Sequence, residues 1–208
     1  MPFTAKSGKF NASINTVEFG TGDKAVKIGG ENVFPLYSFD AAIENAPKVG
    51  IEITDFGMEH EPECIKKYYE GCATLADMAR KAASMEGVDF LSFRMEGGDP
   101  NGANKSTEEL IGELKEIADA VDLPLVVCGC KNVEKDAELF SKAAEALNGK
   151  NAVILSAKEE NYKTVGAAAG LAYKQIVGTT YVHNDTLAVN TKLRDQYVKL
   201  FSQVDINS

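Results

Sequence analysis

The segment Val88–Leu110 reads VDFLSFRMEGGDPNGANKSTEEL and joins three kinds of local sequence. Its first six residues are largely apolar, which favours a buried β-strand. Residues 94–105 are rich in Gly and Asn and predict a loop. Ser106 and Glu109 then have the spacing of a capping box, in which each side chain bonds the other residue's backbone amide. The segment therefore predicts a strand, a polar loop and a well-capped helix.

The same order of strand, loop and helix recurs from Val49 to the end of the chain. Short apolar runs return at intervals of roughly 30 to 40 residues, and helical periodicity lies between them. Nearly continuous apolar strands of this kind are typical of a parallel sheet covered on both faces. The predicted strands are 49–56, 88–95, 123–130, 151–157 and 175–182, and the predicted helices are 74–85, 106–121, 137–147 and 161–173.

Two folds satisfy this repeat, an open doubly wound sheet and a (β/α)8 barrel. No G-x-G-x-x-G follows the first strand and no P-loop motif occurs, so a dinucleotide-binding sheet loses its main support. Polar residues follow several predicted strands, as at the mouth of a barrel. We therefore predict an α/β fold of the TIM (β/α)8-barrel type. Because four or five strands do not close such a barrel, we expect it to be incomplete at its C-terminus, unless the sheet is open.

The first part of the chain has a different pattern. Residues 13–20 and 24–30 favour two strands around the turn 20–23, so they predict a β-hairpin. Residues 32–39 include Pro35 and predict an edge strand or an extended connection. We expect two regions, an N-terminal hairpin with its lead-in over 1–45 and a βα-repeat barrel domain over 46–208.

Composition excludes several classes of partner and site. The net charge of −9 disfavours nucleic acid and anionic membranes. There is no run of 18 apolar residues and no signal-peptide pattern, so we expect a cytoplasmic protein. The four cysteines, at 64, 72, 128 and 130, have the spacing of neither zinc nor iron–sulfur motifs. They predict free thiols and no metal site.

Polar residues after the predicted strands are the candidates for ligand binding. Part of the pattern has simpler explanations, since residues 97–100 can form an ordinary turn and Asn132 can cap a helix. A calcium loop is excluded because Ala103 and Leu110 stand at ligand positions. No nucleophile is paired with a base, so we predict no catalytic residue. The wider polar set includes Arg94, Cys130 and Ser156. The predicted cofactor-binding residues are Asp55, Glu96, Gly98, Asp99, Asn101, Asn104, Asn132, Glu159 and Asn161.

Three stretches together resemble a known family. VGIEITDF (49–56), RMEGGDPNGANKS (94–106) and the long stretch 129–173 resemble the small (delta) subunit of the corrinoid iron–sulfur protein. That protein belongs to the carbon monoxide dehydrogenase/acetyl-CoA synthase system. Residues 27–41 resemble the lead-in to its barrel, and the resemblance runs to Gly178. Residues 179–203 depart from the family's pattern.

The resemblance implies a TIM barrel and a methyl-carrying complex. The implied partner is a large subunit that carries the [4Fe–4S] cluster and a mobile corrinoid domain. This heterodimer accepts a methyl group from methyltetrahydrofolate or an archaeal pterin through a separate methyltransferase, and passes it to acetyl-CoA synthase. The small subunit would shelter the corrinoid at its barrel mouth, with Asp99, Asn101, Asn104, Asn132 and Asn161 facing it. The alternative is a pterin-dependent methyltransferase of the same barrel type, in which Asp55, Asp99 and Asn132 would hold the pterin.

Overall fold

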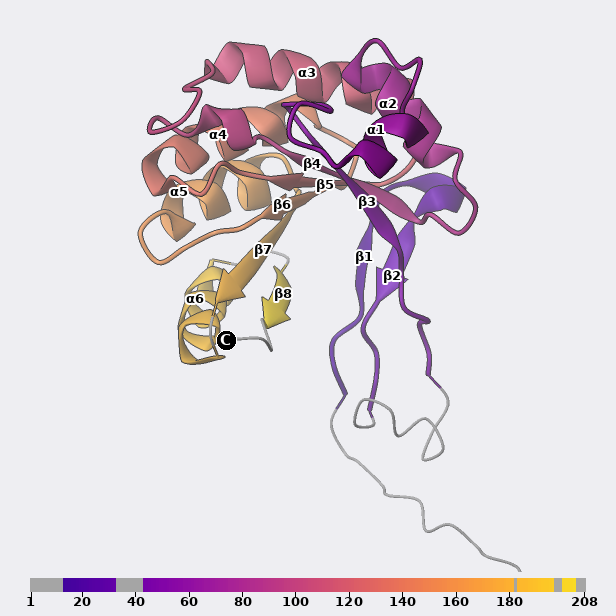
Figure 1. Ribbon diagram of the computed structural model, residues 1–208. Coiled ribbons are helices and arrows are strands. Elements are labelled where there is room, and N and C mark those ends of the chain that lie inside the picture. Colours follow the sequence, from indigo (N-terminus) through magenta and orange to yellow (C-terminus); the bar gives the residue numbers. More distant parts are fainter. Residues whose placement is uncertain (1–12, 33–42, 182, 197–199, 205–208) are drawn as a thin grey trace, which may run out of the picture.

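The computed structural model describes residues 13–32, 43–181, 183–196 and 200–204, which form an α/β fold (Figure 1). A six-stranded sheet and a separate two-stranded sheet make up its β-structure. The predicted α/β class and the predicted N-terminal hairpin are confirmed. The predicted extended segment around Pro35 and the final residues 205–208 lie outside the described residues.

The large sheet is parallel, and each strand pairs with the next one along the chain. Right-handed crossovers that always advance in one direction put their helices on one face. The strand order therefore differs from that of a doubly wound sheet, which reverses at a switch point. Among the described residues β3 and β8 remain as two edges, so the sheet is open and no eight-stranded barrel closes. The strands are β3 Gly50–Thr54, β4 Phe90–Arg94, β5 Leu125–Cys128, β6 Val153–Leu155, β7 Ile176–Tyr181 and β8 Leu200–Val204.

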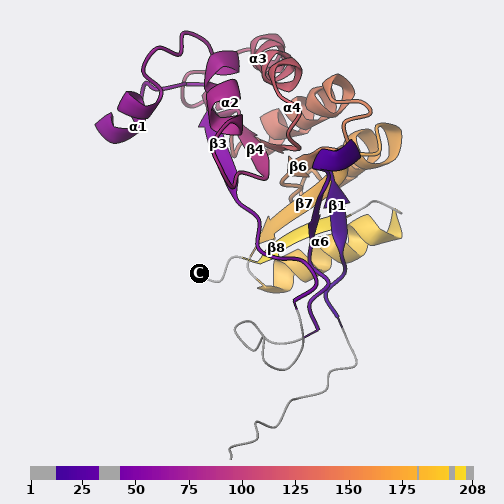
Figure 2. The same ribbon diagram turned by 90° about the vertical axis from the view of Figure 1, so that its right-hand side faces the viewer.

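Helices follow the strands and gather over one face of the sheet (Figures 1 and 2). None of the helices in the described ranges combines the length and apolarity that crossing a bilayer needs. Residues 179–203, which depart from the expected pattern, contain the end of β7, a helix and most of β8. The helices are α1 Glu63–Tyr68, α2 Leu75–Ala83, α3 Thr107–Ala120, α4 Val133–Ala146, α5 Tyr162–Val165 and α6 His183–Asp195, with a π-helical continuation of α5, η3 Gly166–Ala172, and short 3-10 turns η1 Gly22–Lys24 and η2 Glu96–Gly98.

The two faces of the sheet have different covers, as the alternation along β4 shows. Leu91 and Phe93 are buried in the larger core together with Leu110 and Leu114 of α3. Phe90, which precedes Leu91 and points to the other face of the sheet, packs instead against the smaller cluster with the N-terminal strands. A strand that buries apolar residues on both faces reads as a continuous apolar run, which is why the sequence predicted a doubly covered sheet.

The hairpin provides the second cover. Strands β1 (Val17–Phe19) and β2 (Val26–Ile28) pair antiparallel and lie on the side of the sheet opposite α2, α3 and α4 (Figure 1). The Phe19 and Phe90 rings meet edge to face, with centroids 5.6 Å apart. At the turn, the Gly20 N–H donates to the Asn151 carbonyl oxygen at 2.8 Å. The hairpin is therefore attached to the sheet by both apolar and polar contacts.

Candidate functional site at the carboxyl end of the sheet

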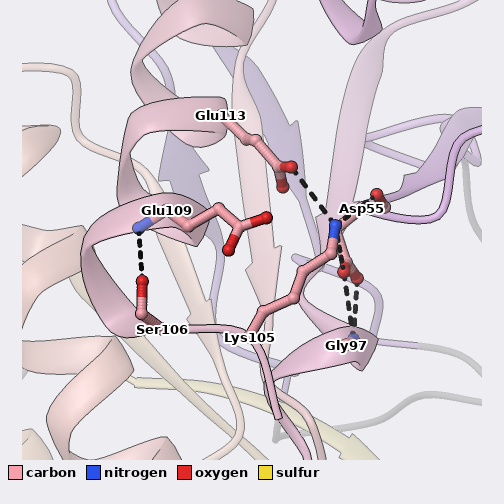
Figure 3. A network of polar contacts seen from close by, with 6 residues as sticks. All are labelled: Asp55, Gly97, Lys105, Ser106, Glu109 and Glu113. Atoms are coloured by element: carbon pink, nitrogen blue, oxygen red, sulfur yellow. Dashed lines mark hydrogen bonds and ion pairs between the residues drawn. The ribbon is translucent and has the colours of Figure 1, made fainter. Parts of the chain in front are cut away.

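Asp55, which follows β3, holds the loop that follows β4 (Figure 3). The Gly97 N–H donates to both carboxylate oxygens of Asp55, at 2.9 and 3.1 Å. Lys105 Nζ lies 3.1 Å from Asp55 Oδ2 and donates to the Asp55 backbone oxygen at 2.9 Å. The Asp55 side chain is fully buried. We call Asp55, Gly97 and Lys105 the loop clamp, because they fix both ends of the loop.

The two glycines of this loop approach the chain's own atoms closely. A Cβ on Gly97 would lie 2.2 Å from Asp55 Oδ2, and a Cβ on Gly98 would lie 2.9 Å from Leu110 Cδ1. Real Cβ atoms do not come so near to their neighbours. The glycines therefore serve packing at this loop, between the carboxylate on one side and α3 on the other.

Glu113 of α3 extends the loop clamp on the helix side. Its Oε1 lies 3.3 Å from Lys105 Nζ, whereas its Oε2 is buried and has no hydrogen-bond partner in the described part of the chain. Burial raises the pKa of the Glu113 carboxyl against the opposing effect of Lys105. Burial also opposes the charge of Lys105, but Asp55 and Glu113 together keep the pKa of that ammonium above its ordinary value. Lys105 thus joins two carboxylates that would otherwise repel each other.

The tip of the same loop points its polar groups outward. Asp99 Oδ1 accepts from the backbone N–H and the side-chain amide of Asn101, at 3.0 and 3.3 Å. Asn104 is exposed and has a left-handed backbone with φ of 52°. Glu96 is exposed as well. Of the predicted cofactor-binding residues, these are the ones whose side chains reach solvent from one loop.

The predicted residues after the next two strands use their polar atoms within the chain. Asn132 caps α4, since its Oδ1 accepts from the Lys135 N–H at 3.1 Å. Asn161 is buried and accepts from the Lys158 N–H at 2.7 Å while donating to the Val133 carbonyl oxygen at 3.2 Å. Glu159 is exposed and forms an ion pair with Lys192 of α6.

A cavity of about 760 Å³ lies against the sheet face that carries the hairpin, and we call it the hairpin-face cavity. None of the nine predicted cofactor-binding residues lines it, although Arg94 and Ser156 of the wider polar set do. Arg94 makes a bidentate ion pair with Glu52 of β3, with both N–O distances at 2.8 Å. Sequence reasoning missed the remaining polar lining. Alternation along β3 and β4 carries the signal, because Glu52, Ser92 and Arg94 interrupt otherwise apolar strands. The missed polar residues are Lys48, Glu52, Ser92, Cys128, Lys131, Asp136 and Lys158.

Asp136 is the buried carboxyl of this cavity. Its Oδ1 accepts from the Cys130 N–H at 2.7 Å, and a Cβ on Gly129 would lie 2.2 Å from the same oxygen. Burial raises the pKa of Asp136. Burial also raises the pKa of the Cys130 thiol to about 11, so that thiol is protonated at neutral pH and is a poor nucleophile. The geometry offers binding groups at this edge of the sheet and no activated nucleophile among the described residues.

A family model described as CO dehydrogenase/acetyl-CoA synthase delta subunit matches residues 16–201. The chain belongs to this delta subunit family. The match includes both strands of the hairpin, the loop clamp and the lining of the hairpin-face cavity. It also extends through residues 179–201, most of the segment that departs from the pattern expected of the family.

Relatives within the delta subunit family come from archaea. The acetyl-CoA decarbonylase/synthase complex subunit delta of Methanothermobacter thermautotrophicus is 31% identical over 163 residues, 77% of this chain and 41% of the relative. The corresponding subunit of Methanocaldococcus jannaschii is 30% identical over 169 residues, 77% of this chain and 41% of the relative. Subunit delta 1 of Methanosarcina thermophila is 28% identical over 179 residues, which cover 85% of this chain and 41% of the relative. The matched part of the chain thus spans less than half the length of each of these relatives.

Proposed function

We propose that the chain acts as a delta subunit that shelters a corrinoid cofactor during methyl transfer. In this proposal a large partner subunit carries the corrinoid and a [4Fe–4S] cluster. The complex receives the methyl group from a methyltransferase, with methyltetrahydrofolate or an archaeal pterin as donor, and delivers it to acetyl-CoA synthase. The match of the delta subunit family model to residues 16–201 carries the proposal.

The consecutive order of the parallel strands supports the finer fold that this function implies. In a TIM-type barrel the neighbouring parallel strands follow one another in sequence and the helices cover one face, and this sheet has both features. We propose that β3 to β8 correspond to six neighbouring strands of such a barrel. The carboxyl end of the strands, where the loop clamp lies, is then the barrel mouth.

The chemistry at this end fits a corrinoid, which is a large macrocycle with amide side chains. Asn101 and Asn104 offer exposed amide groups on one loop, which can exchange hydrogen bonds with amides of the cofactor. Asp55, Asn132 and Asn161 bond to the chain itself, so in this proposal they hold the loops in position. A bound corrinoid supplies the cobalt that carries the methyl group. The chain's own residues contribute binding, orientation and exclusion of water.

An anaerobic pull-down on the tagged chain from native extract tests the proposal. We expect a stoichiometric larger partner, a corrinoid absorption spectrum, and both cobalt and iron in the eluate. The double variant Asn101→Ala/Asn104→Gly should keep the partner and its iron but retain less cobalt, because it removes two exposed amides while glycine suits the left-handed backbone at 104.

Asn148→Ala is the matched control, since Asn148 is an exposed amide at the opposite end of α4. It should leave the ratio of cobalt to iron unchanged. A colourless eluate without a partner would contradict the sheltering role. Tight binding of methyltetrahydrofolate by the isolated chain would favour the pterin-dependent methyltransferase instead.

A further inference from the structure

The hairpin-face cavity is lined by both apolar and polar residues. Its apolar walls come from the sheet, through Phe90, Val126 and Leu155, and from the hairpin, through Phe19 and Ile28. Its volume of about 760 Å³ lies within the range of roughly 300 to 1,000 Å³ that small-molecule sites occupy. The cavity is therefore large enough for an organic ligand with an apolar body.

The charged lining of the cavity is mainly cationic, although the whole chain carries a net charge of −9. Two of the cations are already paired, Lys48 with Asp89 at 3.2 Å and Arg94 with Glu52. Lys131 and Lys158, which follow β5 and β6, have ammonium groups without a hydrogen bond or ion pair to any described residue. The lining holds two carboxyls: Glu52, which pairs with Arg94, and Asp136, on which the charge of Lys158 acts at longer range. Two lysines of the lining thus carry ammonium groups without an ion pair to a described residue, and the Asp136 carboxyl already accepts from the Cys130 N–H.

Lys131 stands where glycine would fit the backbone better. Its φ is 71°, in the left-handed region that costs a residue with a Cβ of the order of 1 kcal/mol. A glycine takes this conformation without that cost. The chain thus has a lysine side chain at the cavity at the expense of local stability, a pattern typical of residues that serve binding.

We propose that the hairpin-face cavity binds a small amphipathic anion. Its carboxylate or phosphate group lies against Lys131 and Lys158, and its aromatic or aliphatic body packs on Phe90, Val126 and Leu155. This site uses other residues than the loop tip of the corrinoid proposal, although Lys131 and Lys158 also follow strands at the carboxyl end of the sheet. It does not depend on that proposal.

Titrations of the chain with three probes test the site, followed by amide shifts in heteronuclear NMR spectra. The probes are 4-phenylbutyrate, phenyl phosphate and the neutral 4-phenylbutyramide. We expect the anions to shift the amides of Ser92, Cys128 and Gly129 and to bind about tenfold more tightly than the neutral amide, as a charge-assisted bond implies. The tighter of the two anions identifies the head group, and equal affinities support the shared chemistry.

Variants separate binding from folding. Lys131→Gly and Lys158→Met should each weaken anion binding about tenfold, whereas Lys115→Met, on the exposed side of α3, should leave it unchanged. Lys131→Gly should also unfold at a urea midpoint equal to or above that of the unmodified chain, so its weaker binding cannot come from damage to the fold. The proposal is overturned if the neutral amide binds as tightly as the anions, or if Lys115→Met weakens binding as much as the cavity variants do.

Discussion

Two buried aspartates at the carboxyl end of the sheet each contact a glycine, but they differ in the charged groups beside them. Asp55 contacts Gly97 and Asp136 contacts Gly129. A Cβ added to either glycine would lie 2.2 Å from an oxygen of the neighbouring carboxylate. Asp55 then meets an ammonium group directly, through Lys105. Asp136 has only backbone and thiol partners nearby, and Lys158 acts on it from a distance. The first carboxylate is closed within the loop clamp, while the second belongs to an open cavity.

This contrast shows that a glycine beside a carboxylate does not by itself identify a ligand site. In both places the glycine admits a side chain of the chain itself. The difference lies in the charge balance. The loop clamp provides its own cation, whereas Lys131 and Lys158 of the cavity lining make no ion pair with a described residue. Substitutions at the two sites should therefore have different consequences.

The largest effect should come from Asp55→Ala. The variant removes the acceptor of the Gly97 N–H and one of the two carboxylates that pair with Lys105. Removing one partner of a buried ion pair lowers the free energy of unfolding by about 3–5 kcal/mol. Urea unfolding monitored by circular dichroism measures this loss. A cost below about 1 kcal/mol would show that the loop clamp contributes little to stability.

Gly97→Ala should have the next largest effect. The added methyl group overlaps the Asp55 carboxylate, and such overpacking costs about 1–3 kcal/mol. Gly112→Ala is the matched control, because Gly112 lies within α3 and a Cβ there would meet nothing within 4 Å. That control should gain up to about 1 kcal/mol from helix propensity. Equal effects of the two substitutions would contradict the close approach at Gly97.

The helix caps beside the two sites should be equivalent. Ser106 caps α3 beside the loop clamp, and Asn132 caps α4 beside the cavity, each through one bond of 3.1 Å. Replacing either residue by alanine should cost about 1 kcal/mol. Thermal unfolding of the two variants under the same conditions tests this, and a difference well above that amount would show that one cap has a second role.

The smallest effect should be a change in pH dependence. Because burial raises the pKa of Asp136, the folded chain keeps a proton at pH values where the unfolded chain has lost it. Stability therefore falls as pH rises through the window from the ordinary value of 3.8 to the raised pKa. Asp136→Asn removes this contribution, so its stability relative to the unmodified chain should rise with pH across that window.

Asp77→Asn provides a control of opposite sign. Hydrogen bonds from Thr74 and from backbone amides lower the pKa of Asp77. The ionised Asp77 carboxylate therefore stabilises the fold at pH values above its ordinary pKa, and this stabilisation is lost as pH falls through the lowered pKa. Urea midpoints from about pH 3 to pH 7 measure both variants. If the two differences change with pH in the same direction, the assignment of the Asp136 shift to burial is wrong.

The fold was largely predictable from local pattern, because apolar runs and helical periodicity locate strands and helices without reference to the rest of the chain. The capping residue Ser106 was predicted, but its box forms only in part. The Glu109 N–H bonds the Ser106 side chain, whereas the complete reciprocal box forms at Thr74 and Asp77 of α2. Closure of the barrel was not predictable, because it depends on which strand edges meet.

The sequence predicted where the candidate site residues lie in the fold better than it predicted what their side chains do. Asp55, Gly98 and Asn161 lie at the expected end of the sheet, yet the structure shows their packing or hydrogen bonding within the chain. Sequence alone does not show whether a polar atom already has a partner. Their assignment to a cofactor stays a prediction, as does the division of the chain at residue 46. Glu52 and Lys131 were not predicted as lining residues, because the cavity that they line is bounded by hairpin residues from a distant part of the sequence.

The attachment of the hairpin also has a consequence for the order of folding. The side-chain amide of Asn151 donates to the backbone oxygens of Glu18 and Gly20, contacts that span 133 and 131 residues. Contacts of such long sequence separation form slowly, because a large loop must close before they contribute. We therefore expect β1 and β2 to reach their final position late in folding, and not before the chain has been synthesised at least as far as Asn151.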